Sequence, residues 1–316
     1  MGWKQRCRQA RRYPLLKNNR ILITGPASQA TFPIARELAR SNTVYGLARW
    51  SNRDDRKKVE AVGIETLAAD LADDALDHLP DGLDYVLNFA NVKTGSFDYD
   101  LRANVEGVGR LMSRCRDARA FLYCSSTAVY EANGRHAFSE SDPLGDNHRA
   151  LFATYSIGKI AAESMVRFCA REFELPSIIC RLNVPYGDNG GWPGFHLEMM
   201  AAGMEIPLHS SDGPCLYSPI HEDDYTATIP ALLGAASVPA TTVNWCGDET
   251  VGIEDWCNYM GELTGLEARF ARSDATLESV VTDPARLNEI TGPRSTVGWK
   301  DGIKRMVAAL HPELLA

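Results

Sequence analysis

The sequence lacks several features that would place it in a specialised class of protein. It contains no run of about 18 apolar residues, the length that a membrane-spanning helix needs. Its 33 basic residues are outnumbered by 41 acidic ones, which gives a net charge of −8. Because nucleic-acid affinity depends largely on basic contacts to phosphates, this balance argues against a general polyanion binder. We therefore expect neither a membrane nor a nucleic acid as a partner.

The cysteines also lack the spacing of a metal site or a disulfide framework. All eight are spread along the chain, and no pair has Cys-x-x-Cys spacing. Several stand inside apolar runs, as Cys169 and Cys180 do. We therefore expect buried free thiols in a reducing cytoplasm, and no metal site.

Residues 1–19 are an exception to the acidic average, because they hold basic residues and no acidic one. No apolar segment or small-residue cleavage site accompanies them, so we do not expect a secretory signal. We predict a flexible or loosely helical tail, with binding to a partner or an anionic surface as the alternative. The basic residues are Lys4, Arg6, Arg8, Arg11, Arg12 and Lys17.

What the sequence does contain is an alternation of short apolar runs with segments of helical period. Its 316 residues, 45% of them apolar, are enough for a full core and roughly two domains of about 150 residues. The alternation predicts an α/β fold, a doubly wound parallel sheet of the Rossmann type. Strands are predicted at residues 20–24, 43–48, 66–69, 84–90, 120–124 and 177–181, and helices at 29–40, 101–116 and 154–173.

The regular alternation ends after Gly187, and the stretch from there to Pro219 is typical of loops with short helices. We predict a tail (1–19), a dinucleotide-binding domain (20–185) and a smaller, mainly substrate-binding region (186–316) with some segments returning to the core. Open α/β sheets bind ligands at the carboxyl ends of their strands. The smaller region is therefore expected to lie across those ends.

The turn after the first predicted strand is a weak candidate for a pyrophosphate site. Such turns are rich in glycine, so that backbone N–H groups and a helix N-terminus can approach the phosphates. Only Gly25 is present here, with Ser28 and Thr31 at the positions of the second and third glycines. Their hydroxyls can donate to phosphate oxygens, and Gln29 lies between them. A simple strand–turn–helix connection is the alternative.

The end of the second predicted strand favours NADP over NAD. An NAD site usually places an acidic residue there for the ribose 2′-hydroxyl, whereas arginine accommodates a 2′-phosphate. The chain has Arg49, with Ser51 and Arg53 nearby, and no acidic residue before Asp54. The planar guanidinium suits a phosphate, although a solvated surface arginine is the alternative. Asp70, after the third predicted strand, would accept from the adenine amino group unless it is only an exposed loop residue.

Tyr155 and Lys159 are four residues apart and therefore lie on one face of a predicted helix. An ammonium group beside a phenol favours the phenolate and lowers the phenol pKa. The phenol can then exchange a proton with a substrate oxygen while a nicotinamide transfers hydride. Ser126, near the carboxyl end of a predicted strand, can hold the same oxygen. Asn104 lies near the start of another predicted helix.

Together these motifs resemble the extended branch of the short-chain dehydrogenase/reductase superfamily, the epimerase/dehydratase family. The resemblance covers nearly the whole chain after residue 19, and its specificity lies in the order and spacing of the landmarks. These are Thr24-Gly25, Asp70-Leu71, Asn88-Phe89-Ala90, Asn104, Ser125 to Tyr130, Tyr155 to Lys159, Arg181 to Gly187, and Ile220 to Asp224.

The resemblance implies that Tyr155 is the acid/base, Ser126 holds the reacting oxygen, and Lys159 tunes Tyr155 and binds the nicotinamide ribose. It implies structural roles for His221 and Asp224. It also implies a homodimer through the helix of Tyr155 and the helix after Asn104, although core packing explains the same pattern. The expected cofactor-binding residues are Gly25, Ser28, Gln29, Arg49, Asp70, Leu71, Ala90, Asn104, Tyr155, Lys159, Asn183 and Val184.

Two departures from the family pattern bear on the reaction. Dehydratases of the family carry an Asp-Glu pair just after the catalytic Ser/Thr, where this chain has Thr127-Ala128. Nucleotide-sugar epimerases place a diphosphate-binding arginine four residues before the histidine of the His-x-Asp-Asp motif. Here that position is Tyr217. Dehydration is therefore not expected, and a substrate diphosphate would lose a strong contact.

A group of apolar residues favours an apolar substrate cleft, although ordinary core packing is the alternative. Trp192 and Tyr217 are its candidate substrate contacts. We predict an oxidoreductase that transfers hydride between NADP, or NAD, and a ketone or alcohol. The alternatives are a sugar or nucleotide-sugar epimerase with bound NAD and, third, a non-catalytic cofactor-binding regulator. The group comprises Trp192, Phe195, Met199, Met200, Met204 and Tyr217.

Overall fold

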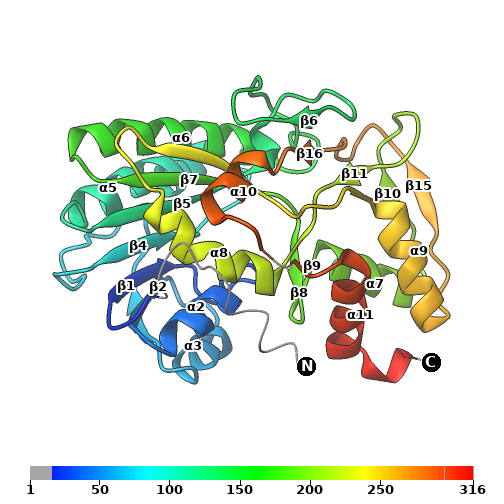
Figure 1. Ribbon diagram of the computed structural model, residues 1–316, viewed down its shortest axis with the longest axis horizontal. Helices are drawn as coiled ribbons and strands as arrows, with labels where there is room; N and C mark the ends of the chain where they lie inside the picture. Colours follow the sequence, from blue (N-terminus) through cyan, green and yellow to red (C-terminus); the bar gives the residue numbers. More distant parts are fainter. Residues whose placement is uncertain (1–15, 295, 316) are drawn as a thin grey trace.

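A seven-stranded parallel sheet forms the centre of the protein (Figure 1), in a computed structural model that describes residues 16–294 and 296–315. Its strand order is β13-β7-β5-β4-β1-β2-β3. The predicted Rossmann-type α/β fold is confirmed. The strands are β1 (Arg20–Thr24), β2 (Thr43–Ala48), β3 (Glu65–Ala68), β4 (Tyr85–Asn88), β5 (Ala120–Ser126), β7 (Ser177–Leu182) and β13 (Thr241–Trp245).

Helices cover both faces of this sheet, which explains why its strands are near-continuous apolar runs. On one face pack α5 (Gly107–Arg114) and α6 (Tyr155–Glu172). On the other pack α2 (Phe32–Ala39), α8 (Glu222–Gly234) and α10 (Ala285–Thr291), as Figure 1 shows. Buried aliphatic residues such as Ile21, Leu22 and Ile23 alternate between the two cores.

A smaller lobe lies beside the sheet, on the right in Figure 1. It is built on α7 (Trp192–Ala201), α9 (Ile253–Thr264) and α11 (Trp299–Leu310) and has its own apolar core. The remaining elements are α3 (Arg53–Glu60), α4 (Phe97–Leu101), a π-helical segment (Arg102–Glu106), β6 (Ala137–Phe138), β8 (Pro185–Gly187), β9 (Gly190–Gly191), β10 (Ile206–Leu208), β11 (Leu216–Tyr217), β12 (Ile220–His221), β14 (Val251–Gly252), β15 (Phe270–Arg272), β16 (Val281–Thr282), and 3-10 turns at Thr127–Val129 and Pro312–Leu314.

The structure contains several elements that the sequence analysis did not predict, among them α3 and the helices α8 to α11, and others that differ from the prediction. The single helix predicted at 101–116 is divided into α4, the π-helical segment and α5. The stretch predicted as loops with short helices contains the ten-residue α7. The sheet gains a seventh strand, β13, which returns from the C-terminal part of the chain to pair with β7. Most of the predicted basic tail, residues 1–15, lies outside the described residues.

A buried ion-pair cluster joins α6 to the centre of the sheet. The guanidinium of Arg181 on β7 donates to both carboxylate oxygens of Glu163, at 2.9 and 2.8 Å. The Ser125 hydroxyl donates to the same carboxylate at 2.7 Å, and Arg167 donates at 2.9 Å. Glu163 and Arg181 are 0% and 2% exposed, so the pair is shielded from water. The cluster therefore fixes α6 against the end of β5.

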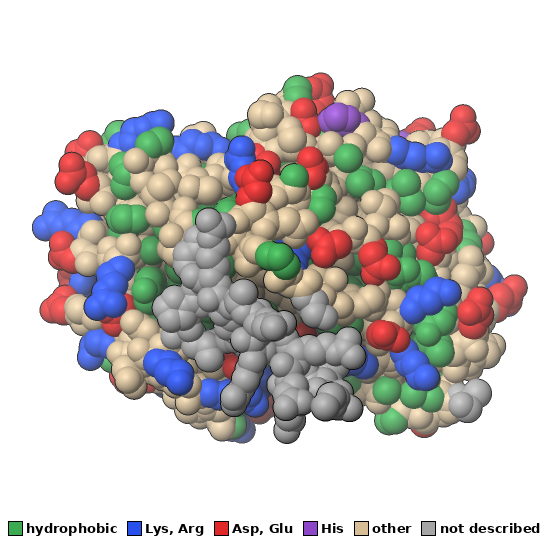
Figure 2. Space-filling view, viewed as in Figure 1, with side chains coloured by type: hydrophobic (Ala, Val, Ile, Leu, Met, Phe, Trp, Pro, Cys, Tyr) green, Lys and Arg blue, Asp and Glu red, His purple; other side chains and the backbone are tan. Residues whose placement is uncertain are grey.

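The surface shows no sign of strong charge segregation on the face seen in Figure 2, where acidic and basic side chains are interleaved. None of the helices in the described part of the chain is both long and apolar enough to cross a membrane. The seven cysteines in that part are buried and carry free thiols.

Candidate functional site

Two adjoining cavities open at the carboxyl ends of β1, β4, β5 and β7, where open α/β sheets bind ligands. The smaller, of about 290 Å³, lies over the ends of β1 and β2. The larger, of about 680 Å³, runs toward the smaller lobe and is called the cleft below. Gly25, Ser28, Ala90 and Asn91 line both. The two cavities therefore form one elongated site.

The turn after β1 approaches the loop after β4 closely. Gly25 has a φ of +64°, which favours glycine, and a Cβ there would lie 3.4 Å from the Cα of Ala90. The hydroxyls of Ser28 and Thr31 lie 2.8 Å apart and bond to each other. Gln29 donates to the carbonyl of Gly190 at 3.3 Å, which ties the turn to the smaller lobe. Ser28 and Thr31, which stand at the positions of two glycines, thus stabilise the turn by their bond to each other.

The Thr24 hydroxyl organises this junction, a role that the sequence analysis did not assign. It donates to Asn88 at 2.6 Å and accepts from the N–H groups of Phe89 and Ala90 at 3.0 and 2.8 Å. Thr24 is 0% exposed. One side chain therefore holds the ends of β1 and β4 in register beside the site.

We expect Thr24→Val to lower the free energy of unfolding by about 1–3 kcal/mol, because it leaves buried donors and an acceptor without partners at nearly constant volume. Urea denaturation measures this difference. Thr43→Val, at an exposed position on β2, is the matched control and should stay within about 0.5 kcal/mol. Equal losses in the two variants would contradict the role given to Thr24.

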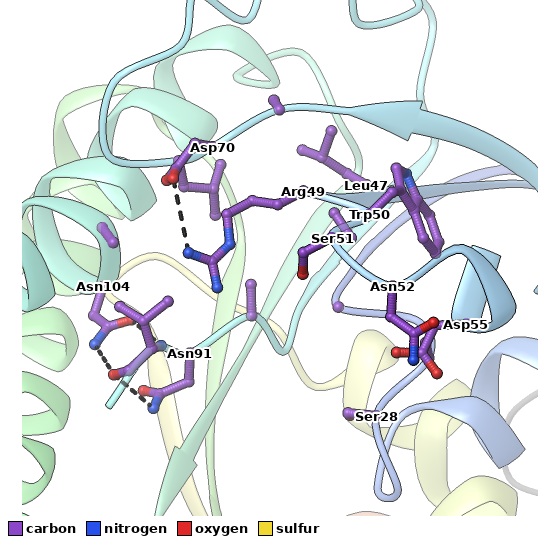
Figure 3. A pocket seen from close by; sticks show the side chains of 18 residues that line it. Ser28, Leu47, Arg49, Trp50, Ser51, Asn52, Asp55, Asp70, Asn91 and Asn104 are labelled. Carbon is purple, nitrogen blue, oxygen red and sulfur yellow. Dashed lines mark hydrogen bonds and ion pairs between the residues drawn. The ribbon is translucent and has the colours of Figure 1, made fainter. Parts of the chain in front are cut away.

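Arg49, Tyr99 and Asp70 form a chain of three side chains at the smaller cavity, and Figure 3 shows its two ends, Arg49 and Asp70. Arg49 donates to the Tyr99 hydroxyl at 2.8 Å, and Tyr99 donates to Asp70 at 2.6 Å. The guanidinium of Arg49 also lies 3.9 Å from the Asp70 carboxylate. Burial opposes ionisation of Asp70, but the bonds from Tyr99 and from the Ala72 N–H outweigh it and lower the pKa of Asp70. Tyr99 thus links Arg49 to Asp70 by hydrogen bonds, a role that the sequence analysis did not predict.

The same cavity brings together further predicted and unpredicted residues. Leu71, a predicted cofactor-binding residue, lines it next to Asp70. Asn52 accepts from the Asp54 N–H at 2.9 Å and caps α3, and Asp55 in the first turn of α3 also lines the cavity. The sequence analysis did not single out Asp55. Its carboxylate faces the same space as Arg49.

Asn104 and Asp100 fix the loop that follows β4. The Asn104 amide accepts from the Val92 N–H and donates to the Val92 carbonyl, both at 2.8 Å. Asp100 is 1% exposed and accepts from the Thr94 N–H and hydroxyl and from the Thr154 hydroxyl. Asn104, a predicted cofactor-binding residue, lines the smaller cavity, but its polar atoms are used by the loop. The loop is therefore rigidly held against the start of α6.

The structure brings Ser126, Tyr155 and Lys159 to one wall of the cleft. Ser126 ends β5 and accepts from the Ala128 N–H at 3.2 Å. Tyr155 begins α6, and Lys159 follows one turn later. The Lys159 ammonium donates to the carbonyl of Cys124 at 2.7 Å and lies 6.0 Å from the centroid of the Tyr155 ring. The spacing of four residues therefore gives the expected common face.

The expected lowering of the Tyr155 pKa is not found. Burial raises the pKa of Tyr155 to about 12, and the hydrogen bond with Ser126 opposes this only in part. Burial also lowers the pKa of Lys159. Desolvation outweighs the ammonium group because Lys159 is bound to a backbone carbonyl and not to the phenol. Tyr155 is therefore a protonated phenol at neutral pH.

Asn183 is not free to contact a ligand through its side chain. Its amide donates to the Val280 carbonyl at 2.8 Å and accepts from the Ser218 N–H at 3.3 Å. It joins the end of β7 to the smaller lobe, which the sequence does not reveal because its partners are distant along the chain. Val184, the other residue predicted near the nicotinamide, lines the cleft.

The far wall of the cleft is aromatic. Trp192 lies edge-on to Tyr217, with ring centroids 4.9 Å apart, and both line the cleft. The Tyr217 hydroxyl donates to the Glu278 carbonyl at 2.7 Å. His196, also in the wall, accepts at Nδ1 from the Trp256 indole at 3.0 Å, and burial lowers the pKa of His196 to about 4. The imidazole is thus neutral at pH 7.

The wall carries few charged groups. Among the described residues that line the cleft, the cations are Lys93 and Lys159, and none is an arginine. Of the predicted apolar group, Met200 is buried in the core of the smaller lobe and Met204 is exposed outside the lining. The apolar and aromatic part of the lining consists of Phe89, Leu151, Phe152, Leu182, Val184, Trp192, Phe195, Met199, Tyr217, Leu277 and Val280.

Comparison with known proteins shows to which family the chain belongs. Residues 21–235 match the model of the NAD dependent epimerase/dehydratase family. The chain belongs to this family. The resemblance noted in the sequence is therefore confirmed. No curated protein sequence matches the chain.

Solved structures of this family share the fold. A UDP-glucuronic acid 4-epimerase from Bacillus cereus, in complex with UDP-glucuronic acid and NAD, has a TM-score of 0.80 at 18% identity, covering 93% of this chain and 99% of that chain. A dTDP-glucose 4,6-dehydratase from Streptomyces venezuelae with NAD bound has a TM-score of 0.79 at 20% identity (93% and 97% covered). A UDP-N-acetylglucosamine 4-epimerase from Methanobrevibacter ruminantium M1 has 0.79 at 15% (94% and 100%).

Proposed function

We propose that the protein is an oxidoreductase that moves hydride between a nicotinamide dinucleotide and a ketone or secondary alcohol. The observation that carries this proposal is the convergence of Ser126, Tyr155 and Lys159 on one wall of the cleft. That cleft is continuous with the cavity at Arg49 and Asp70. A group capable of proton transfer thus lies at one end of a site long enough for a dinucleotide.

The residues of the elongated site fit such a cofactor. Gly25 has no side chain and packs closely on Ala90, so its backbone is open to the site where a pyrophosphate would lie. Arg49 and Asp70 would hold the adenosine end, and Tyr155 and Lys159 the nicotinamide ribose. When bound, the nicotinamide supplies or accepts the hydride.

The residues of the chain supply the proton and orient the reacting oxygen of the substrate. A protonated Tyr155 can donate to a carbonyl oxygen as hydride reaches the carbonyl carbon. The Ser126 hydroxyl can donate a second hydrogen bond to the same oxygen, stabilising the developing charge. Burial raises the pKa of Tyr155, so at neutral pH the phenol carries the proton that ketone reduction requires.

The cleft supports an apolar substrate for this reaction. Its wall is largely apolar, and the position expected for a diphosphate-binding arginine is Tyr217, whose hydroxyl is bonded to a backbone carbonyl. A diphosphate would lack the bidentate contact that arginine provides.

A nucleotide-sugar epimerase that uses NAD is the second candidate. Family membership and the similar solved structures favour it, since those proteins are epimerases and a dehydratase of nucleotide sugars crystallised with NAD or nucleotide sugars. Asp55, which lines the smaller cavity, also suits ribose hydroxyls better than a 2′-phosphate. Dehydration is disfavoured because Thr127-Ala128 lacks the acidic pair. The third hypothesis, a non-catalytic regulator, gives no role to Ser126, Tyr155 and Lys159 in the cleft.

A homodimer through α5 and α6 remains part of the proposal. Phe168 on α6 is 60% exposed, and such a large apolar side chain favours burial against a partner.

Thermal unfolding with NADP⁺, NAD⁺ and a UDP-sugar separates the two candidates. A ligand at about 100 times its Kd adds about 2.7 kcal/mol of stability. We expect NADP⁺ to stabilise the protein and Arg49→Ala to remove that shift, because the guanidinium is the group suited to the 2′-phosphate. Arg40→Ala, at an exposed position after α2 and outside the cavity lining, is the matched control and should keep it. Stabilisation by NAD⁺ or a UDP-sugar alone would favour the epimerase over the NADP-dependent oxidoreductase.

A further inference from the structure

Lys93 is a cation in the cleft that the proposed reaction does not use. Its ammonium lies 4.2 Å from the ring centroid of Phe152 and 5.5 Å from that of Tyr155. It therefore stands beside the group that is to transfer the proton. Within residues 16–294 and 296–315, no carboxylate forms an ion pair with it.

The backbone on both sides of Lys93 is held in place. Val92 is bound at its N–H and its carbonyl by the Asn104 amide, and Thr94 is bound at its N–H and hydroxyl by the buried Asp100. Asp100 also accepts from Thr154, the residue before Tyr155. These contacts fix the backbone of Lys93 relative to Tyr155.

His148 adds a second polar group at the same place. Its ring centroid lies 5.8 Å from that of Tyr155, and it lines the cleft with Lys93. Its Nδ1 is buried and has no hydrogen-bond partner among the described residues. Burial and the nearby Lys93 lower the pKa of His148 to about 4, so it stays neutral at pH 7.

We propose that Lys93 and His148 bind a carboxylate of the substrate beside the reacting carbon. One positive charge and one neutral imidazole match a monoanion better than a phosphate dianion, because phosphate sites favour arginine forks. The rest of the wall is apolar. The substrate is then a keto acid or hydroxy acid with an apolar body, and its carboxylate is bound without being altered. This inference rests on the proposed function.

Calorimetric titration of the protein saturated with oxidised cofactor tests the subsite without requiring turnover. The probes are phenylacetate, 3-phenylpropanoate and 4-phenylbutanoate, with their methyl esters as uncharged counterparts. We expect at least one acid to bind more tightly than its ester. Lys93→Met should weaken that acid about tenfold or more, the scale of a lost charged hydrogen bond, and leave the ester unchanged. Lys93→Arg should restore most of the acid affinity.

Lys300→Met is the matched control, because Lys300 is exposed and also lies over two aromatic rings, those of Tyr259 and Trp299, away from the cleft. It should leave acid binding unchanged. The inference is overturned if no acid binds, if Lys93→Met weakens acid and ester equally, or if it weakens cofactor binding instead. Failure of the cofactor itself to bind the unmodified protein would count against the proposed function, which keeps the two failures distinct.

Discussion

Replacing Tyr155 with phenylalanine is expected to lower kcat by about 10²- to 10⁴-fold, the usual contribution of a positioned general acid. The variant keeps the ring that packs against Phe152 and His148 and loses only the hydroxyl. Cofactor affinity should therefore change little. A large loss of kcat with an unchanged Kd for the dinucleotide would identify the hydroxyl as the proton donor.

Steady-state kinetics with fluorescence titration of the reduced cofactor measures both quantities. Tyr259→Phe, in the smaller lobe, is the control, since the Tyr259 ring lies edge-on to Trp299 and outside the cleft lining. It should have the kcat of the unmodified protein. Full activity of Tyr155→Phe would exclude the mechanism, because the Tyr155 hydroxyl is the proton donor in it.

The largest effect on stability is expected at Glu163. Its replacement by glutamine leaves the Arg181 guanidinium buried without a full counter-charge, and breaking a buried pair in this way costs about 3–5 kcal/mol. Urea denaturation measures the loss. Glu172→Gln, at an exposed position near the end of the same helix, is the control and should change the unfolding free energy by less than about 0.5 kcal/mol.

The pH dependence of stability gives an independent check on Glu163. Burial raises the pKa of Glu163, but the hydrogen bonds and charge of Arg181, with Ser125 and Arg167, outweigh burial and hold the pKa below its usual value of 4.5. A lowered folded-state pKa contributes stability that is present above the unfolded-state pKa and lost as pH falls through the folded one. Stability should therefore fall less steeply below pH 4.5 in Glu163→Gln than in the unmodified protein. Parallel curves would contradict the pairing.

Much of the fold could be predicted from the sequence because its central strands are buried on both faces. Ile21–Ile23 and the runs at β5 and β7 are continuous apolar segments, and helices of clear period separate them. β13 escaped prediction, because Thr241–Trp245 carries polar residues and follows its partner β7 by about sixty residues. The π-helical segment was also missed, since its sequence has the same period as the α-helices that flank it.

The candidate site could be predicted where spacing along one element decides the geometry. Tyr155 and Lys159 share a face because both lie on α6. The roles of Tyr99, Asp100 and Lys93 could not be predicted, because each depends on a partner from another element. Asp100, for example, meets Thr154 across 54 residues of chain. A polar residue that is fully buried in the structure marks such a role, but the sequence does not show its burial.

The Tyr155 pKa was predicted in the wrong direction for a related reason. The sequence places the Lys159 ammonium near the phenol, and such a charge lowers the phenol pKa. Desolvation raises that pKa, but it depends on every group packed around the phenol. In the structure Lys159 is bound to the Cys124 carbonyl, and burial dominates. The raised pKa means that Tyr155 is a protonated phenol, the form that acts as the acid in the proposed reaction.

Cofactor consumption during turnover tests the proposed reaction most directly. The protein, in catalytic amount, is incubated with NADPH or NADH and a panel of apolar ketones and keto acids, and absorbance at 340 nm is followed together with the alcohol formed. We predict that one reduced cofactor disappears for each alcohol produced, over many turnovers, and that Tyr155→Phe abolishes this consumption. Interconversion of nucleotide sugars with no net change in absorbance, in the absence of added cofactor, would contradict the oxidoreductase and establish the epimerase.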